Sequence, residues 1–359
     1  MNTPTLLIPP ADKIRLRVMF LAKHAKASGT ADAADGNHAI YHHEMRTTLE
    51  GIGLNVIAQD SFDAIYSKPD VDYVVTLLNR GGFVNSEMLA PLLLTRHGIP
   101  FMGASPIVRG LGDDKHLMKM AALHRGVPVT PWEIHRQGQG ALREPAFEWK
   151  KLVVKPNASS ASWGVGIFED WAEAEAHAQA VLAEGHDAIV EAYAPQTDVV
   201  VPVVSGANGP WILPMMRFQV EGRDDNFRSY EEKRSLGDDA AKEELMRVED
   251  PALEARLQNY VRAMLKEVWP CDYGRFEFRY DPATRDVRFM EVNLSCNLWS
   301  KKTVSGAARS IGVGHAALVE TIVAHSMLRQ GVIDHALGGE RGDVPVRLEP
   351  ALPAQVEVG

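Results

Sequence analysis

Four polar residues have the types and the spacing of a site for a metal ion and a phosphate. The segment PATRD (282–286) separates two runs rich in Phe, Tyr, Val and Arg, a pattern that predicts a β-hairpin. With a five-residue loop, Glu277 would lie opposite Glu291, and Arg275 opposite Asn293. Because side chains two residues apart share one face of a strand, we expect all four to project from the same side.

This arrangement would bring together groups that bind hard cations. Two carboxylates that face each other across strands repel, and a cation would remove the repulsion. Mg²⁺ takes carboxylate and amide oxygens, usually with substrate phosphates and water, and Mn²⁺ shares this preference. Glu277, Glu291 and Asn293 are therefore candidate metal ligands, and Arg275 could hold a phosphate bidentately. The alternative is a solvated face on which Glu277 pairs with Arg275 or Arg279.

Three lysines occupy positions that suit phosphate binding. Lys115 lies in the first turn of a predicted helix, and Lys155 ends a predicted strand before the small-residue loop NASSASWGVG. Lys233 lies in a charged segment, 221–244, that we expect to be a mobile loop. A loop of small residues lets backbone N–H groups approach a phosphate closely. The spacing matches neither a Walker A motif nor a dinucleotide fingerprint, so each lysine could also be a surface residue.

Two further groups of residues invite a ligand. In IVEAYAPQTDVVV an apolar strand ends at Glu191 and reaches Asp198, so this edge could recognise an adenine and a ribose, or could be an acidic loop. His38 and His42 are four residues apart on a helix, but no Cys or acid is spaced to complete a zinc site. One of these histidines could instead contact a substrate.

The elements that must position these residues alternate in type. In the first hundred residues we expect strands at 14–22, 54–60, 73–78 and 99–103, with helices at 39–51 and 86–98. Alternation of strands and helices predicts a small parallel α/β domain. Farther along we expect helices at 113–126, 168–185, 252–268 and 304–329, and strands at 151–156, 187–193, 198–206 and 210–220.

Composition narrows the class of protein. The chain has 359 residues, enough for two or three domains, and its 45% hydrophobic and 24% charged content is ordinary for a globular protein. A net charge of −9 argues against a nucleic-acid or anionic-membrane surface. We expect no membrane span and no signal peptide. Two cysteines, Cys271 and Cys296, fit a reducing compartment, and we expect a cytoplasmic protein.

Six fragments in the same order resemble the ATP-grasp superfamily, in its D-alanine–D-alanine ligase branch. They extend over about residues 75–325 and are LLNRGGFVNSEMLAPLLLTRHGIPFMGAS, DDKHLMKMAALHRGVPVTPW, VVKPNASSASWGVG, VEAYAPQTD, SYEEKRS and GRFEFR with EVN. The resemblance implies an α/β and α+β multidomain protein with the ATP-grasp fold. Its parts would be an N-terminal parallel α/β domain at 1–106, a central subdomain at 107–192, a C-terminal subdomain with the metal hairpin at 193–335, and a flexible tail at 336–359.

The resemblance also implies roles for individual residues. ATP would bind between the central and C-terminal parts, with Lys115 and Lys155 on its phosphates, Ser160 and Ser162 in a lid over them, and Lys233 on the γ-phosphate. The adenine would meet Glu191, Ala192, Tyr193 and Ala194, and the ribose would meet Asp198. Glu277, Glu291 and Asn293 would bind two Mg²⁺ ions, and Arg275 would steady the transferred phosphoryl group.

The implied reaction joins two small molecules, and the implied assembly is a homodimer. ATP would convert a substrate carboxylate into an acyl phosphate, which an amine would attack to form an amide. The positions that read the two D-alanines in this family are altered: Leu78, Ala161, Arg234 and residues 294–297 depart from its pattern. We therefore expect another carboxylate and amine, and Lys301 and Lys302 favour an acidic substrate. A non-amine nucleophile, a D-alanine–D-alanine ligase proper and an inactive nucleotide-binding regulator are the alternatives.

Overall fold

The structure is a computed structural model of the chain. It describes residues 4–82, 85–159, 162–194, 197–220, 243–338 and 344–348. Two predicted site residues, Ser160 and Lys233, lie outside the described residues, as do Ala161 and Arg234. The segment predicted to be a mobile loop, 221–244, also lies outside them except for its last two residues.

The N-terminal region is the expected parallel α/β unit. Strands β2 (Arg17–Leu21), β3 (Asn55–Gln59) and β4 (Tyr73–Thr76) form a parallel sheet in the order β3-β2-β4. The helices of this region are α1 (Pro10–Arg15), α2 (His38–Gly51), α3 (Asp63–Tyr66) and α4 (Leu89–His97). Helix α4 ends at Gly98, whose φ of 66° is the left-handed conformation expected of a C-terminal glycine.

Two expectations for this region were wrong. The strand predicted from residue 14 begins only at Arg17, because Pro10 opens helix α1 and leaves Ile14 81% exposed on it. The strand predicted at 99–103 is a single parallel bridge between Phe101 and Val74. Neither difference moves a residue of the site.

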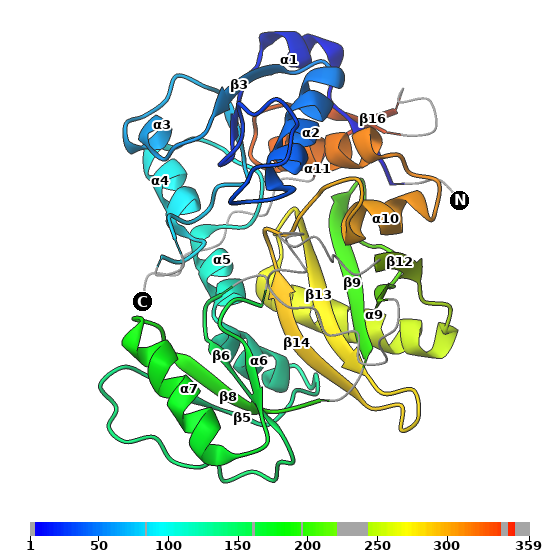
Figure 1. The fold of residues 1–359 in the computed structure, drawn as a ribbon. Coiled ribbons are helices and arrows are strands. Elements are labelled where there is room, and N and C mark those ends of the chain that lie inside the picture. The colour runs from blue at the N-terminus through cyan, green and yellow to red at the C-terminus, as the bar shows by residue number, and fades with distance from the viewer. Residues whose placement is uncertain are drawn as a thin grey trace, which may run out of the picture.

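The central region is a four-stranded antiparallel sheet that carries one helix. Its strands β5 (Trp132–His135), β6 (Leu152–Pro156), β7 (Gly166–Phe168) and β8 (Ala188–Ala192) run in the order β5-β8-β6-β7. Helix α7 (Trp171–Ala183) covers one face (Figure 1). Helices α5 (Pro106–Asp113) and α6 (Lys115–His124) lead into this region, and Asp114 caps α6 by accepting from the Leu117 amide at 2.8 Å.

The C-terminal region is a larger antiparallel sheet. Its strands are β9 (Thr197–Gly206), β10 (Gly209–Ile212), β11 (Met216–Val220), β12 (Glu243–Arg247), β13 (Tyr273–Tyr280) and β14 (Val287–Asn293). They run in the order β12-β11-β9-β13-β14, with β10 on β9, and α9 (Pro251–Val268) buries its apolar face against them. The single helix predicted at 304–329 is two helices, α10 (Thr303–Arg309) and α11 (His315–Arg329), because Gly312 takes a φ of 84°.

Part of the tail that we expected to be flexible is ordered. Strands β15 (Ala336–Gly338) and β16 (Val344–Val346) form a sheet with β1 (Leu6–Leu7), in the order β1-β15-β16. The N-terminal strand therefore holds the chain just after residue 336. Among the described residues, none of the helices has the length and apolar character needed to cross a membrane.

The hairpin β13–β14 has the predicted pairing at the site residues but a different pairing nearer the turn. Arg275 faces Asn293 and Glu277 faces Glu291, as expected. Nearer the turn, however, Tyr280 pairs with Val287, so the loop is one residue longer than predicted. A β-bulge between Glu277 and Phe278, with Met290 as the extra residue on β14, cancels this shift. Because a one-residue slip moves a side chain to the opposite face, the bulge is what keeps the two glutamates on the same side.

Two carboxylates, a fully buried one and a partly buried one, join the N-terminal part of the chain to the C-terminal region. Asp272, fully buried before β13, accepts from the Gly103 amide at 2.7 Å, from Ser326 Oγ at 2.6 Å and from Arg329 Nη2 at 2.9 Å. Glu44 on α2 accepts from Trp299 Nε1 and from the Ser300 amide, which belong to the loop before α10. Helix α2 and this loop can therefore act as one wall of a site.

Candidate active site

A cavity of about 530 Å³ lies where the three regions meet. Helix α2 and the loop before it line one end, the central sheet and its hinge line the other, and the hairpin β13–β14 lies between them. The predicted site residues that line it are Lys115, Lys155, Ser162, Glu191, Ala192, Tyr193, Ala194, Asp198, Arg275, Glu277, Glu291 and Asn293. The fold thus brings together every predicted site residue that the structure describes.

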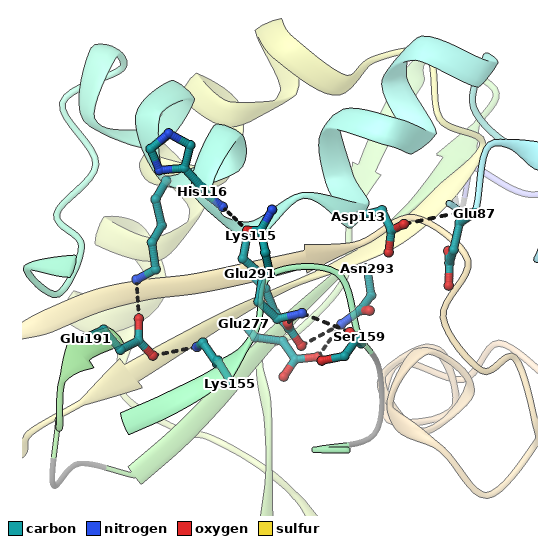
Figure 2. Close-up of polar contacts among 12 residues, drawn as sticks. Glu87, Asp113, Lys115, His116, Lys155, Ser159, Glu191, Glu277, Glu291 and Asn293 are labelled. Atoms are coloured by element: carbon teal, nitrogen blue, oxygen red, sulfur yellow. Dashed lines mark hydrogen bonds and ion pairs between the residues drawn. The ribbon is translucent and has the colours of Figure 1, made fainter. Parts of the chain in front are cut away.

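The hairpin presents the four residues that first suggested chemistry, and Figure 2 shows three of them, Glu277, Glu291 and Asn293. Asn293 Nδ2 donates to Glu277 Oε1 at 2.8 Å and to Glu291 Oε1 at 3.2 Å, so the amide links the two carboxylates. Arg275 Nε lies 2.7 Å from Glu277 Oε1. Glu277 pairs with Arg275, as the alternative of a solvated hairpin face predicted. The pair is not solvated, however, because it faces the cavity and about three quarters of each side chain is buried.

These residues fit a magnesium ion. Two carboxylates and an amide meet within hydrogen-bond distance, and both glutamate side chains keep about a quarter to a third of their surface exposed, at 25% and 30%. Oxygen donors at the edge of a solvent-filled cavity are what Mg²⁺ uses when phosphates and water complete its shell. Bulge residue Met290 also lines the cavity and adds an apolar surface beside the donors.

Lys115 lies beside the hairpin β13–β14 rather than in the ion-pair cluster of Lys155. Its Nζ donates to the carbonyl of Ser159 at 2.8 Å and lies 3.5 Å from Glu291 Oε2. Asp114 orients the first turn of α6 through its cap, and Asn157 Oδ1 accepts from the His116 amide at 2.9 Å. Lys115 thus joins the hairpin to the start of the Ser-rich loop that follows β6 (Figure 2).

A buried cluster contains a lysine that the sequence analysis missed. Lys119, one turn after Lys115 on α6, is fully buried and lies 2.7 Å from Glu191 Oε2. Lys155 pairs with the other oxygen of Glu191, and Thr130 Oγ1 donates to Glu191 Oε2 at 3.1 Å. The available signal was the four-residue spacing of Lys115 and Lys119, which puts both on one side of a helix.

The electrostatics of this cluster depend on Glu191. Burial raises the pKa of Glu191, but the ammonium groups of Lys119 and Lys155 outweigh burial and hold it below its ordinary value. Burial lowers the pKa of Lys119, and Glu191 opposes that shift. Each Glu191 oxygen contacts one lysine, and Glu191 also lines the cavity, so its contact with an adenine stays a prediction. Of the two lysines, Lys155 is the one that lines the cavity.

The segment at the end of β8, Ala192 to Ala194, differs in which of its backbone amides are already hydrogen-bonded. The Ala192 amide donates to Pro131 and the Tyr193 amide to Lys151, so neither amide can donate to a base. The Ala194 amide makes no such hydrogen bond within the described part of the chain, which leaves it as the donor of the predicted trio. Asp198 pairs with Arg279 at 3.1 Å, and the Arg279 guanidinium carbon lies 6.0 Å from the Tyr193 ring centroid.

The opposite end of the cavity is built by α2 and the loop before it. His42 is buried and its Nδ1 accepts from the His24 amide at 3.2 Å. His24 and Lys23 both bind Asp35, which is itself 3% exposed. Across residues 4–348, as far as they are described, no three His, Cys, Asp or Glu side chains are placed to hold a metal, so the structure gives no support to a zinc site at His38 and His42.

Several residues of this end were absent from the predicted site. Lys301 and Lys302 were predicted together to favour an acidic substrate, but only Lys302 lines the cavity, whereas Lys301 is exposed outside it. Arg80 and Glu87 also line the cavity and lie 3.1 Å apart. The available signal was the fragment LLNRGGFVNSEMLAPLLLTRHGIPFMGAS, which contains both residues and carries part of the family resemblance.

Comparison with known proteins identifies the family. Residues 123–324 match the model of the family described as "D-ala D-ala ligase C-terminus". The chain is 25% identical over 251 residues to a D-alanine–D-alanine ligase of Maridesulfovibrio salexigens, covering 68% of this chain and 78% of the relative. It is 26% identical over 247 residues to the uncharacterized protein y4sG of Sinorhizobium fredii, covering 66% and 69%.

Solved structures agree on the fold. The D-alanine–D-alanine ligase of Bacillus anthracis superposes with a TM-score of 0.69 at 19% identity, and its complex with ATP superposes with 0.67 at 18%. Both comparisons cover 88% of this chain and 99% of the other. The VanG D-Ala:D-Ser ligase of Enterococcus faecalis gives 0.64 at 13% identity, covering 87% and 99%. Since the family model spans more than half of the chain, the protein belongs to the D-alanine–D-alanine ligase family of ATP-grasp enzymes, the ATP-dependent ligases that join a carboxylate to an amine and release ADP and phosphate.

Proposed function

We propose that the cavity binds ATP with Mg²⁺ and activates a carboxylate other than that of D-alanine. The observation that carries this proposal is the facing pair Glu277 and Glu291, which Asn293 links inside a cavity that Lys115 and Lys155 also line. The hinge at Ala194 would meet the adenine, and Asp198 would meet the ribose. Lys155, held by Glu191, would face the phosphates, and the fully buried Lys119 would hold Glu191 from the other side.

In the first step, a carboxylate oxygen of the substrate attacks the γ-phosphorus, and the bond to the β-phosphate bridging oxygen breaks. ADP leaves, and the substrate becomes an acyl phosphate. Mg²⁺ on Glu277, Glu291 and Asn293 would neutralise phosphate charge, and Mn²⁺ could take the same oxygens. Arg275, paired with Glu277 in the cavity, would steady the phosphoryl oxygens during transfer.

In the second step, an amine attacks the carbonyl carbon of the acyl phosphate. The carbon–oxygen bond to phosphate breaks, phosphate leaves and the nitrogen loses a proton, which gives the amide. The chain contributes position and exclusion of water, because water would hydrolyse the acyl phosphate. Ser160 and Ser162 in the loop after β6, and Lys233 on the γ-phosphate, are proposed to cover the phosphates.

The substrate pair is proposed to differ from two D-alanines. Leu78, which stands where the resemblance has a histidine, lines the cavity. Residues 295–297, where the family pattern has Ser-Pro-Gly, are Ser, Cys and Asn and also line it. A substrate that differs at these contacts is therefore expected, and relatives named for D-alanine do not fix the substrate of this chain.

The decisive test of the proposal is Glu291→Gln. It keeps the size of the side chain and removes one metal-binding charge, so we expect Mg²⁺-dependent ADP release in the presence of substrate acids to fall at least 100-fold, with an unchanged circular-dichroism spectrum. The control is Glu184→Gln, at an exposed position after α7 and outside the cavity. Wild-type ADP release by Glu291→Gln would remove the metal assignment.

Assembly and setting are separate proposals. The family resemblance favours a homodimer, which light scattering coupled to size-exclusion chromatography would check. Two buried thiols, Cys271 and Cys296, suit a reducing compartment such as the cytoplasm.

A further inference from the structure

At the end of the cavity formed by α2 and the loop before α10, several lining side chains carry hydrogen-bond donors. Its α2 side includes Tyr41 and His42, and the other side includes Asn297 and Lys302. Helix α11 contacts both α2 and α10 (Figure 1), and Glu44 joins α2 to the loop before α10 through Trp299 and Ser300. The wall is therefore a fixed surface that belongs to two regions of the chain.

His42 offers a neutral hydrogen-bond donor. Its Nδ1 accepts from the His24 amide at 3.2 Å, so the hydrogen of the uncharged ring lies on Nε2. Burial, together with His38 and His24, lowers the pKa of His42 to about 3, so the ring stays uncharged at physiological pH. The ring of Tyr41 lies 5.1 Å from that of His42.

Three other groups at this end also donate. Tyr41 Oη accepts from the Leu298 amide at 3.0 Å, which leaves its own hydrogen available as a donor. Asn297 Oδ1 accepts from the Trp299 amide at 2.7 Å, so its NH₂ group is the part that can serve a ligand. Lys302 Nζ lies 5.6 Å from the centroid of the Phe218 ring, and both residues line the cavity.

The carboxylates that line the cavity already have cationic partners in the protein. Among the described residues there are six of them, and the ion pairs are Asp35–Lys23, Glu87–Arg80, Glu191–Lys155, Asp198–Arg279, Glu277–Arg275 and Glu291–Lys115. A buried ammonium group is stable only beside a carboxylate that is not already paired with another cation. An α-ammonium group at the α2 end would lie beside other hydrogen-bond donors and beside Asp35, whose charge Lys23 already neutralises.

We infer that this end selects an acid substrate without an α-ammonium, held through a hydrogen-bond acceptor such as a hydroxyl, a keto oxygen or a second carboxylate. This inference rests on the proposed function, since the acid must place its reacting carboxylate beside Arg275 for activation. His42 and Lys302 are then specificity-determining residues, because they would contact the acceptor group and not the reacting carboxylate.

The experiment uses hydroxylamine as a small amine that does not depend on an acceptor site. Acyl phosphate formed in the cavity then appears as a hydroxamate, which an iron assay detects. The full-length protein with ATP and Mg²⁺ is offered matched acids: alanine (both enantiomers), lactate and pyruvate, then aspartate, malate and succinate. We expect kcat/KM for the best hydroxy, keto or dicarboxylic acid to exceed that of its matched amino acid at least tenfold.

Variants of the cavity residues test which side chains determine the preference for the acid. For the preferred acid, we expect His42→Leu and Lys302→Met each to lower kcat/KM about tenfold through KM, the size of a lost hydrogen bond to a charged group. His42→Gln keeps a neutral N–H donor and should recover part of that loss. Lys301→Met, next to Lys302 but outside the cavity, should match the wild type within twofold. Thermal melts confirm that each variant is folded.

The outcomes separate the two claims. Hydroxamate formed from amino acids in preference to the matched acids would overturn this inference and leave the ligase function standing. Equal effects of Lys301→Met and Lys302→Met would overturn the assignment of this end. No hydroxamate from any acid, with ATP binding intact by calorimetry, would overturn the proposed function and this inference with it.

Discussion

The two ends of the cavity hold their charged groups in different ways. At the nucleotide end, Lys119, Lys155 and Glu191 belong to α6 and to neighbouring strands of one sheet, and they bind each other with less than a tenth of their surface exposed. At the substrate end, His42 and Lys302 are 260 positions apart in sequence and meet only because α2 packs against the C-terminal region. The first end is a buried charge cluster, and the second is a surface assembled by domain contact.

This difference teaches where function can vary. A buried cluster of two cations and one anion tolerates few changes, because the loss of one partner leaves a charge unpaired in a poorly solvated place. At the other end, Asn297 and Lys302 are only partly buried, so their exchange should cost little folding free energy. The nucleotide end should therefore respond to mutation in stability as well as activity, and the substrate end in specificity.

The largest expected effect is on the nucleotide end. Glu191→Gln would leave Lys119 and Lys155 without their shared carboxylate, and we expect the free energy of unfolding to fall by about 3–5 kcal/mol. Added ATP should restore part of the loss, because its phosphates supply negative charge. Urea denaturation with and without ATP measures both effects. A loss no larger than that of Glu184→Gln would show that the cluster is not held by Glu191.

A smaller effect is expected at the proposed lid. Lys233→Ala should lower kcat about 100-fold, the size of one lost donor to a charged transition state. The affinity for ATP, measured by calorimetry, should change much less, since a group that acts on the γ-phosphate during transfer contributes little to ground-state binding. Equal losses of kcat and of affinity would contradict this role.

His42, at the proposed substrate end of the cavity, should make the free energy of unfolding depend on pH. The unfolded chain protonates His42 near its ordinary pKa of 6.5, whereas the folded protein does so only near 3. Between these values the unfolded state binds more protons, so the free energy of unfolding falls as pH falls, by up to about 1.4 kcal/mol per pH unit. Above pH 6.5 this contribution is constant.

The measurement is urea unfolding at pH 7 and pH 5 in the wild type and in His42→Gln. The variant lacks the titrating ring and should show a shallower decline. Glu191 does not blur the comparison, since its carboxyl contributes only below its ordinary pKa of 4.5. Identical slopes in the two proteins would mean that His42 is not held uncharged by the fold.

The smallest effect is expected at the ribose. Asp198 is 46% exposed and pairs with Arg279 at the rim, so Asp198→Asn should raise the KM for ATP by about three- to tenfold, with kcat nearly unchanged. Steady-state kinetics at saturating acid would measure this change. A fall in kcat that exceeds the change in KM would place Asp198 nearer the reaction than the ribose.

The hairpin shows how far local pattern could lead. The sequence placed Glu277 opposite Glu291, and the structure agrees, although the loop length on which the pairing was based is one residue too short. Two departures, a longer loop and a bulge, cancel at the glutamates. The alternation of side chains along strands was a reliable guide to the face, whereas the exact register of the turn was not.

The buried cluster shows where local pattern could not lead. Lys119 has the sequence surroundings of an ordinary helix lysine, and Glu191 has those of a residue at the end of a strand. That they pair follows from α6 packing beside the central sheet, which places Glu191 between Lys119 and Lys155. The carboxylate predicted to contact an adenine also anchors two lysines, which the sequence did not indicate.

By itself, the sequence determined the element types, the order of the three regions and the set of groups able to bind a metal and phosphates, because periodicity, caps and the side-chain chemistry of cations and oxygens act over a few residues. Only the tertiary structure decided which lysine joins Glu191, which of two adjacent lysines, Lys301 or Lys302, enters the cavity, and that His42 is an uncharged donor. Those outcomes depend on burial and on contacts between residues far apart in the chain, and burial sets both the partner and the charge of an ionisable group.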